Sequence, residues 1–333
     1  MSAMASMHAL ITHTDLDGIG SAAVYIRLGS KDERYRVIFV EPDELPEALE
    51  DLWERYGGYL KKLSIMDLAP NLGNIERIFV ILKAFRESGA RIEWFDHHEW
   101  DEEAIAKISS VAELRIDKST CATGVVASSF EERDPYVASI VSAVCSLDLW
   151  RFHDPLSPWL ARLIIYRRDD LWRTILLEML VKSSTLEEVV TWGKRYIERV
   201  VDRELNLYNY YRKKIRITSA DGVKLASVVK RHREISTSSL AHYMLSISGG
   251  DIALVINPSG PLSLRSRKCD VRIVALKLGG GGHKPAAGAF IRVPFLHRIL
   301  YRFGIESPLH SYVLSKVAAA VRSTGCIAIT PST

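Results

Sequence analysis

The segment Asp96-His97-His98 combines one carboxylate with two imidazoles, which are groups that bind metals and phosphates. It directly follows the mostly apolar run Ile92–Phe95, whose composition predicts a buried strand. In open α/β sheets, ligands gather beyond the carboxyl ends of the strands. The types and the position of these residues therefore predict a metal or phosphate site.

A second segment near the start of the chain has the same character. His13, Asp15 and Asp17 alternate with single residues, and Gly18 follows them. Spacing by two in an extended segment places all three side chains on one face, and a glycine lets the chain turn tightly into a helix. Oxygen ligands mixed with imidazole suit Mn²⁺ or Mg²⁺ better than an ion that prefers thiolates. The pattern alone leaves a second interpretation open, in which an aspartate caps a helix beside a turn.

Two further aspartates each end an apolar segment. Asp67 follows the predicted strand Leu63–Met66, and Asp148 follows the apolar helical run Val141–Leu147. Either aspartate alone could be a helix cap. Four separate parts of the chain nevertheless supply acids and imidazoles, and a cation relieves the repulsion between carboxylates that pack together.

The elements that must position these residues alternate between strand and helix patterns in the first part of the chain. Strands are expected at His8–Thr12, Val37–Val40, Leu63–Met66, Arg91–Phe95 and Glu113–Ile116. Helices are expected at Gly20–Leu28, Glu44–Tyr56, Ile75–Ser88, Glu102–Lys107, Thr123–Phe130 and Tyr136–Ser146. This alternation predicts an α/β fold with a doubly wound, mostly parallel sheet. His13, Asp67 and His97 would then lie at its carboxyl edge.

The second part of the chain predicts a helical connection and a smaller α/β domain. Residues 155–216 have a helical pattern throughout, and a turn follows at Asp221-Gly222. Later strands are expected at Val223–Val229, Ile252–Ile256, Leu262–Arg265 and Ala289–Val293, and helices at Ser236–Ser246 and Leu309–Arg322. The segment Val271–Leu278 fits either structure. We therefore expect domains at residues 1–180 and 217–333, joined by a helical linker at 181–216.

Composition places the chain of 333 residues among ordinary globular proteins, with 47% hydrophobic and 25% charged residues. No apolar run reaches the roughly 18 residues needed to span a bilayer, and Met1 to Met7 contain no evident secretory signal. The cysteines Cys121, Cys145, Cys269 and Cys326 form no CxxC pair. We expect them to be reduced thiols in a cytoplasmic protein, although their number leaves a disulfide open.

Charge is distributed unevenly along the chain. Residues 1–117 contain 13 basic and 22 acidic side chains, whereas the remainder contains 31 and 18. An acidic half suits cation binding, and a basic half suits a polyanion such as a nucleic acid. The alternative is that most of these charges only form solvated surfaces.

A glycine run near the carboxyl terminus predicts an anion site. Gly279 to Gly282 carry no side chain that would keep backbone amides from an anion. His283 can donate to a phosphate or stack on a base, and Arg265 offers two parallel donors to a phosphate. A flexible loop and a surface charge are the alternatives.

Taken in order, these segments resemble a known family. His13-Thr14-Asp15-Leu16-Asp17-Gly18, Asp67, Asp96-His97-His98 and Asp148 resemble the successive motifs of the DHH phosphoesterases. Ser263-Leu264-Arg265-Ser266 and the stretch from Gly279 to Gly288 resemble the DHHA1 substrate domain of that family. The resemblance covers roughly residues 8–293. The single residue between His13 and Asp15 is closer to the RecJ-like and archaeal branches of the family.

The resemblance implies two metal ions in a cleft between the two domains. In this family the ions are usually Mn²⁺, and Mg²⁺ is the alternative. It implies that His13 and Asp15 hold one ion, that Asp17, His97 and Asp148 hold the other, and that Asp67 bridges both. By the same resemblance, His98 would face the phosphate and Asp96 would orient its neighbours. Arg265, Gly280, Gly281, Gly282 and His283 would bind the substrate.

The implied function is hydrolysis of a phosphodiester in single-stranded DNA or RNA, or in short oligonucleotides, with release of 5′-nucleotides. A phosphodiesterase for linear or cyclic dinucleotides would use the same site. A pyrophosphatase would share the first domain, but the glycine-histidine segment argues against it. A non-catalytic replication-associated binding protein should lack ligands, whereas every expected position is filled here. No protein partner is indicated, and the apolar tail helix could serve packing or self-association as a homo-oligomer.

Overall fold

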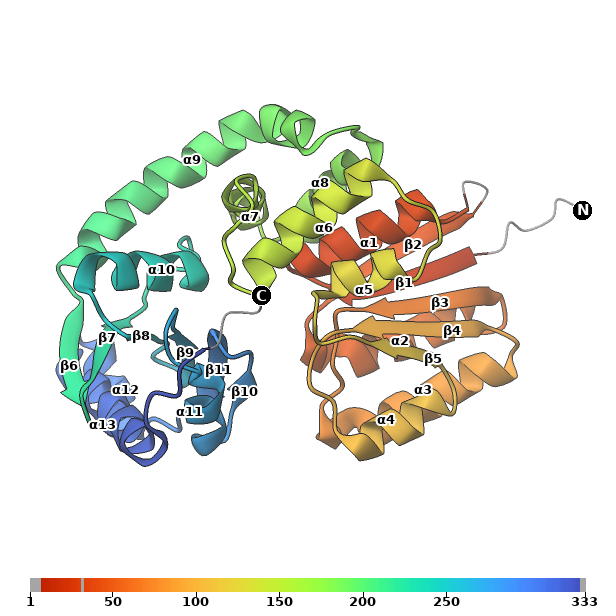
Figure 1. The fold of residues 1–333 in the computed structure, drawn as a ribbon. Helices are drawn as coiled ribbons and strands as arrows, with labels where there is room; N and C mark the ends of the chain where they lie inside the picture. Colours follow the sequence, from red (N-terminus) through yellow and green to blue (C-terminus); the bar gives the residue numbers. More distant parts are fainter. Residues whose placement is uncertain (1–6, 31–32, 330–333) are drawn as a thin grey trace, which may run out of the picture. The chain divides into compact units, whose positions relative to one another are not determined.

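The computed structural model of the protein describes residues 7–30 and 33–329 (Figure 1). Contacts within the chain define two compact units, residues 1–197 and 198–333. The boundary lies inside a long helix, α9 (Leu186–Arg212). Among the described residues, no helix combines the length and the apolar character needed to cross a membrane.

The first unit is built on a five-stranded parallel sheet of order β2-β1-β3-β4-β5. Its strands are β1 (Met7–His13), β2 (Arg34–Val40), β3 (Leu60–Met66), β4 (Arg91–Asp96) and β5 (Glu113–Ile116). The central strands are buried on both faces, as their apolar runs indicate. The predicted α/β fold with a doubly wound, mostly parallel sheet is thus confirmed.

Helices cover both faces of this sheet (Figure 1). The helices on the sheet are α1 (Leu16–Leu28), α2 (Leu45–Tyr56), α3 (Ile75–Glu87), α4 (Glu102–Ser109) and α5 (Ala122–Ser128). Three further helices, α6 (Pro135–Asp148), α7 (Ser157–Tyr166) and α8 (Asp170–Lys182), pack against α1. Helices α2 to α4 pack with the strands around Leu63, Ile65 and Trp94, all fully buried. Helix α1 contacts α5, α6 and α8. Burial of these apolar faces holds the loops at the strand ends in place.

The second unit contains a six-stranded mixed sheet of order β10-β11-β9-β8-β7-β6. Its strands are β6 (Arg216–Ala220), β7 (Val223–Val229), β8 (Ile252–Ile256), β9 (Pro261–Arg265), β10 (Gly281–Gly282) and β11 (Ala286–Phe290). Only the β7–β8 pair is parallel among the described neighbours. Its helices are α10 (Thr237–Ser248), α11 (Val271–Lys277), α12 (Phe295–Arg302) and α13 (Ser307–Thr324).

Four elements of this unit differ from expectation, and one of them is the short strand β10, which was not expected. The last strand is Ala286–Phe290 rather than Ala289–Val293, because its hydrogen bonds to β9 place Ala286 opposite Arg265 and Phe290 opposite Pro261. Strand β6 lies where the helical pattern was expected to end. Helix α12 was not expected at all, since it is short and follows Pro294.

The expectation of four reduced thiols is wrong. Cys121 is bonded to Cys145, and Cys269 to Cys326, over sequence separations of 24 and 57 residues. The fold brings the Cα atoms of each pair to 5.1 and 5.0 Å, within the range that a disulfide requires. The spacing of the cysteines along the sequence does not reveal these pairs, because the paired cysteines come close together only in the folded chain.

Candidate metal centre

The candidate residues of the first unit collect at the carboxyl edge of its sheet. β1, β3 and β4 are adjacent strands. His13 ends β1, Asp67 directly follows β3, and Asp96 ends β4. Because parallel strands all end at the same edge, residues far apart in sequence come close together there.

His97 is the centre of this arrangement. Its Nε2 atom lies 3.5 Å from a carboxylate oxygen of Asp67, 3.5 Å from one of Asp148 and 3.7 Å from one of Asp17. The side chains of His97, Asp17 and Asp67 are each at most 2% exposed. Four separate segments of the chain therefore bring one side chain each to a single point.

A second group adjoins the first through Asp67. Nδ1 of His13 lies 3.1 Å from Asp15 Oδ2 and 3.4 Å from Asp67 Oδ2. Asp15 also caps α1, because its Oδ1 accepts hydrogen bonds from the backbone amides of Asp17 and Gly18. The sequence left open whether an aspartate of this motif caps a helix or belongs to the candidate centre. In the structure Asp15 caps α1 and also lies beside His13. Asp67 lies in both groups, because its Oδ1 is near His97 and its Oδ2 is near His13.

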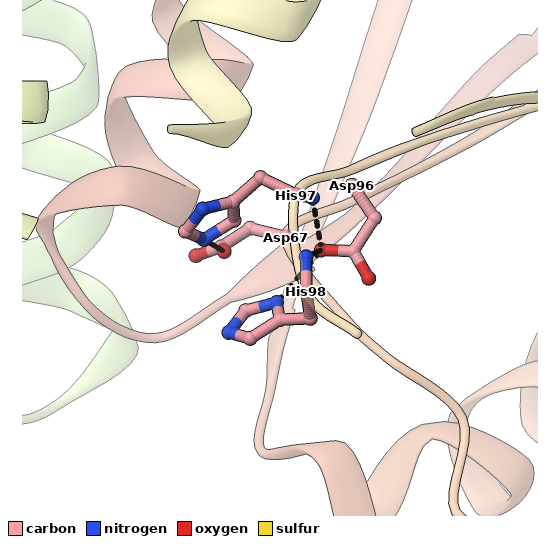
Figure 2. Close-up of side chains that lie close together, drawn as sticks. All are labelled: Asp67, Asp96, His97 and His98. Atoms are coloured by element: carbon pink, nitrogen blue, oxygen red, sulfur yellow. Dashed lines mark hydrogen bonds and ion pairs between the residues drawn. The ribbon is translucent and has the colours of Figure 1, made fainter. Parts of the chain in front are cut away.

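Asp96 is turned away from this centre and holds its neighbours (Figure 2). One oxygen accepts hydrogen bonds from the backbone amide of His97 and from Nδ1 of His98, each at 2.8 Å, and the other accepts one from the indole of Trp100. The side chain of His98 is 43% exposed. Burial acts to lower the pKa of His98, but the hydrogen bond and charge of Asp96 outweigh it and raise this pKa to about 9.

The carboxylates are buried at a considerable electrostatic cost. Burial raises the pKa of Asp67 and of Asp148 well above the ordinary value, and the charge of Asp17 adds to both increases. Asp67 Oδ2 and Asp148 Oδ2 are buried and accept no hydrogen bond from a described residue. Oxygen ligands crowded in this way fit a divalent cation, which would offset their repulsion. The mixed carboxylate and imidazole set suits Mn²⁺ or Mg²⁺.

Backbone geometry around the centre is specialised. Asp67, Trp150 and Phe152 adopt positive φ angles of 58°, 58° and 53°. Such conformations cost free energy and persist where the surroundings fix them, often at functional sites.

Gly18 has a different role from the tight turn that its motif suggested. A Cβ atom there would lie 2.2 Å from the carbonyl oxygen of His13, so only glycine lets α1 begin so close to β1.

Sequence reasoning missed three residues that position the predicted ones. Thr123 and Ala122, at the start of α5, donate hydrogen bonds to the carboxylate of Asp17. Glu41 follows β2 and lies 3.3 Å from His13 Nε2, and the hydrogen bond from His13 lowers the pKa of Glu41 to about 2. Glu41 could have been found, because it directly follows a predicted strand, as His13 and Asp67 do. No local signal marks Thr123.

The glycine run and His283 of the second unit lie in a hydrogen-bonded hairpin. Gly281 and Gly282 pair with Gly288 and Ala287 across β10 and β11. A Cβ atom at Gly280 would lie 2.0 Å from the carbonyl oxygen of Gly288. His283 is in the turn, where its backbone bonds both ways with that of Ala286.

Arg265 ends β9 beside this hairpin. Its guanidinium donates to the carbonyl oxygens of Leu264 and Ala287 and to the hydroxyl of Ser238. These bonds hold the side chain in one orientation, which suits a fixed anion-binding group.

Comparisons with known proteins bear on the fold. The chain matches no protein-family model and no curated protein. Among solved structures it is similar to RecJ in complex with Mn²⁺ from Thermus thermophilus, at 14% identity and a TM-score of 0.56, over 96% of this chain and 52% of RecJ. It is also similar to CDC45 from Entamoeba histolytica, at 8% identity and a TM-score of 0.50, over 95% of each chain. An exopolyphosphatase-related protein from Bacteroides fragilis matches at 17% identity and a TM-score of 0.46, over 93% of this chain and 94% of that one.

The similarities to RecJ and to CDC45 establish the class of fold. The chain has a RecJ-like fold of the DHH type, with a parallel-sheet unit followed by a mixed-sheet unit. It spans about half the length of the RecJ chain. At such low identity the similarity concerns the fold alone.

Proposed function

We propose that the protein is a divalent-metal-dependent phosphodiesterase that hydrolyses single-stranded nucleic acid or short oligonucleotides to 5′-nucleotides. The strongest support is the convergence of Asp17, Asp67 and Asp148 on His97 Nε2, within 3.5–3.7 Å. Buried carboxylates at this density are costly without a cation, so a structural role alone does not account for them.

The residues divide into two proposed ion sites that share Asp67. One would be held by His13 and Asp15, and the other by Asp17, His97 and Asp148. Manganese is the favoured ion because the ligands suit it and because the RecJ structure is a complex with Mn²⁺. When bound, two such ions would supply an activated water and neutralise charge on the phosphate oxygens.

The chain's own residues would orient the substrate around this centre. Asp96 fixes the ring of the half-exposed His98 through Nδ1, and His98 would contact a phosphate oxygen of the substrate. In the second unit, Arg265 is held by Leu264 and Ala287 and would bind a further phosphate. His283 and the hairpin of Gly280, Gly281 and Gly282 would be further substrate-binding groups of the second unit.

The test is an assay with four substrates in Mn²⁺, in Mg²⁺ and with a chelator: a 5′-labelled single-stranded oligonucleotide, a linear and a cyclic dinucleotide, and pyrophosphate. We expect 5′-nucleotides from the oligonucleotide in Mn²⁺ and no product with the chelator. Hydrolysis of dinucleotides alone would narrow the substrate class, and hydrolysis of pyrophosphate alone would overturn the proposal.

Asp67→Asn is the most informative variant, because asparagine tolerates the positive φ of this position and removes only the charge. We expect loss of turnover by a factor of about 1,000 or more, since removal of a shared ligand disables both ions. Asp51→Asn on α2, which is 70% exposed, is the matched control and should retain full activity. Turnover that survives Asp67→Asn would exclude the metal centre.

A further inference from the structure

Helix α12 leaves large apolar side chains uncovered in the second unit. It lies beside α13 (Figure 1), yet none of its residues is fully buried. Phe295 is 74% exposed, Leu296 63%, and Phe303 just beyond the helix 80%. Apolar surface of this kind, concentrated on one short element, marks an interaction site.

A cavity of about 410 Å³ lies along this helix and the turn between β8 and β9. Phe295, Arg298 and Arg302 line it from the helix, at spacings of three and four residues that place them on one face. Pro258 and Ser259 line it from the turn. An aromatic ring and two guanidinium groups therefore share one concave surface.

The charges around this cavity are unbalanced. Arg298 and Arg302 are exposed, and neither forms an ion pair with any residue in the described ranges. No acidic residue occurs between Ala287 and Ile305, and Glu306 is already 3.5 Å from Arg231. Residues 198–333 contain 21 basic and 8 acidic side chains, a net charge of +13. The cavity would therefore attract an anion.

We infer that this cavity binds a strand of single-stranded nucleic acid, with phosphates on Arg298 and Arg302 and a base stacked on Phe295. The inference rests on the proposed function, because it selects a strand over a dinucleotide as the ligand. Nucleic acid offers a repeating anion beside a flat π-face, and proteins bind it with cationic grooves and aromatic platforms. A helix that lies on a membrane would keep its arginines on the face opposite Phe295, whereas here they line the same cavity.

The test measures binding without hydrolysis. Fluorescence anisotropy of labelled single-stranded DNA and RNA, with the full chain in a chelator, gives affinity as a function of salt. We expect the double variant Arg298→Ala with Arg302→Ala to bind more weakly and to reduce the salt slope by about 1.4, at about 0.7 for each phosphate contact of a single strand. Phe295→Leu should weaken binding about tenfold, and Phe295→Tyr should restore it, because the ring supplies the stacking energy.

Arg322→Ala is the matched control, since Arg322 is an exposed arginine of α13 outside the cavity. It should keep the affinity of the wild type, and circular dichroism should show that all variants are folded. An affinity and salt slope of the double variant equal to those of Arg322→Ala would overturn the inference. If the double variant lost binding to phosphatidylserine vesicles but still bound the oligonucleotide, the inference would be overturned in favour of a membrane surface as the ligand.

The two proposals can fail separately. A protein that hydrolyses no phosphodiester but binds a strand through Arg298 and Arg302 would refute only the proposed function. A protein that hydrolyses oligonucleotides while the double variant binds them normally would refute only the α12 site.

Discussion

The carboxylate of Asp17 accepts hydrogen bonds from both the backbone amide and the hydroxyl of Thr123, at 2.9 and 2.6 Å, although 106 residues separate the two positions. A third bond comes from the amide of Ala122. The amino terminus of α5 thereby fixes a buried anion, as helix amino termini commonly do. The bonds hold Asp17 in place, and one of its oxygens lies 3.7 Å from His97.

This relationship predicts that Thr123 controls metal affinity. Thr123→Val keeps the size of the side chain but removes the hydroxyl that donates to Asp17. We expect Mn²⁺ to bind about 10–100-fold more weakly by calorimetry, as is typical when the group that orients a ligand is lost.

Thr123→Ser is the control, because serine retains the donor and should restore most of the affinity. Equal Mn²⁺ affinity in the wild type and Thr123→Val would show that the amides of α5 alone hold Asp17.

The sequence predicts the first unit well because its strands carry strong local signals. The predicted strand Glu113–Ile116 agrees with the structure at both ends, and Arg91–Phe95 differs by one residue. Buried parallel strands are continuous apolar runs with clear boundaries. Residues that follow such strands, including Asp67, could be placed at one edge for the same reason.

What could not be predicted depends on contacts between distant segments. Thr123 carries no pattern of its own, and the disulfide between Cys121 and Cys145 exists only because α5 and α6 pack together. The position of β11 is set by pairing with β9 rather than by the apolar residues Ile291 and Val293. Tertiary context outweighs local preference at each of these places.

Gly18 provides a test of close packing at the centre. In Gly18→Ala the new Cβ would lie 2.2 Å from the carbonyl oxygen of His13, so β1 and α1 must separate. We expect the free energy of unfolding to fall by about 1–3 kcal/mol, as in other overpacked sites, and Mn²⁺ affinity to fall as well. Gly73→Ala is the control, because its Cβ would meet nothing within 4 Å. The close-approach argument fails if both variants unfold at the same denaturant concentration.

The disulfide between Cys121 and Cys145 should affect the metal centre as well as stability. Cys121 precedes Ala122, which bonds to Asp17, and Cys145 is three residues before Asp148. We expect the double serine variant to lose about 3 kcal/mol of stability, the value for a loop of similar length, and to bind Mn²⁺ more weakly.

The second disulfide gives the comparison. Serine at both Cys269 and Cys326 should also lower stability, but it should leave Mn²⁺ affinity unchanged because both positions are in the second unit. Calorimetry that shows the same Mn²⁺ affinity in the two double variants would contradict a positioning role for the first disulfide.

His310 makes the second unit sensitive to acid. It is 1% exposed, and its Nε2 lies 2.8 Å from the hydroxyl of Ser227. Burial, helped by the charge of Arg216, lowers its pKa from 6.5 to about 4. Between these two values the unfolded chain binds a proton that the folded chain excludes. The free energy of unfolding should therefore fall as the pH decreases from 6.5 to 4, with a slope of at most about 1.4 kcal/mol per pH unit from this residue.

Hydrogen exchange of the backbone amides of β7 and α13 measures this stability locally. His310→Gln should flatten the slope, whereas His153→Gln, at an exposed histidine, should not. Equal slopes in the two variants would show that His310 is protonated in the folded chain as readily as in the unfolded one.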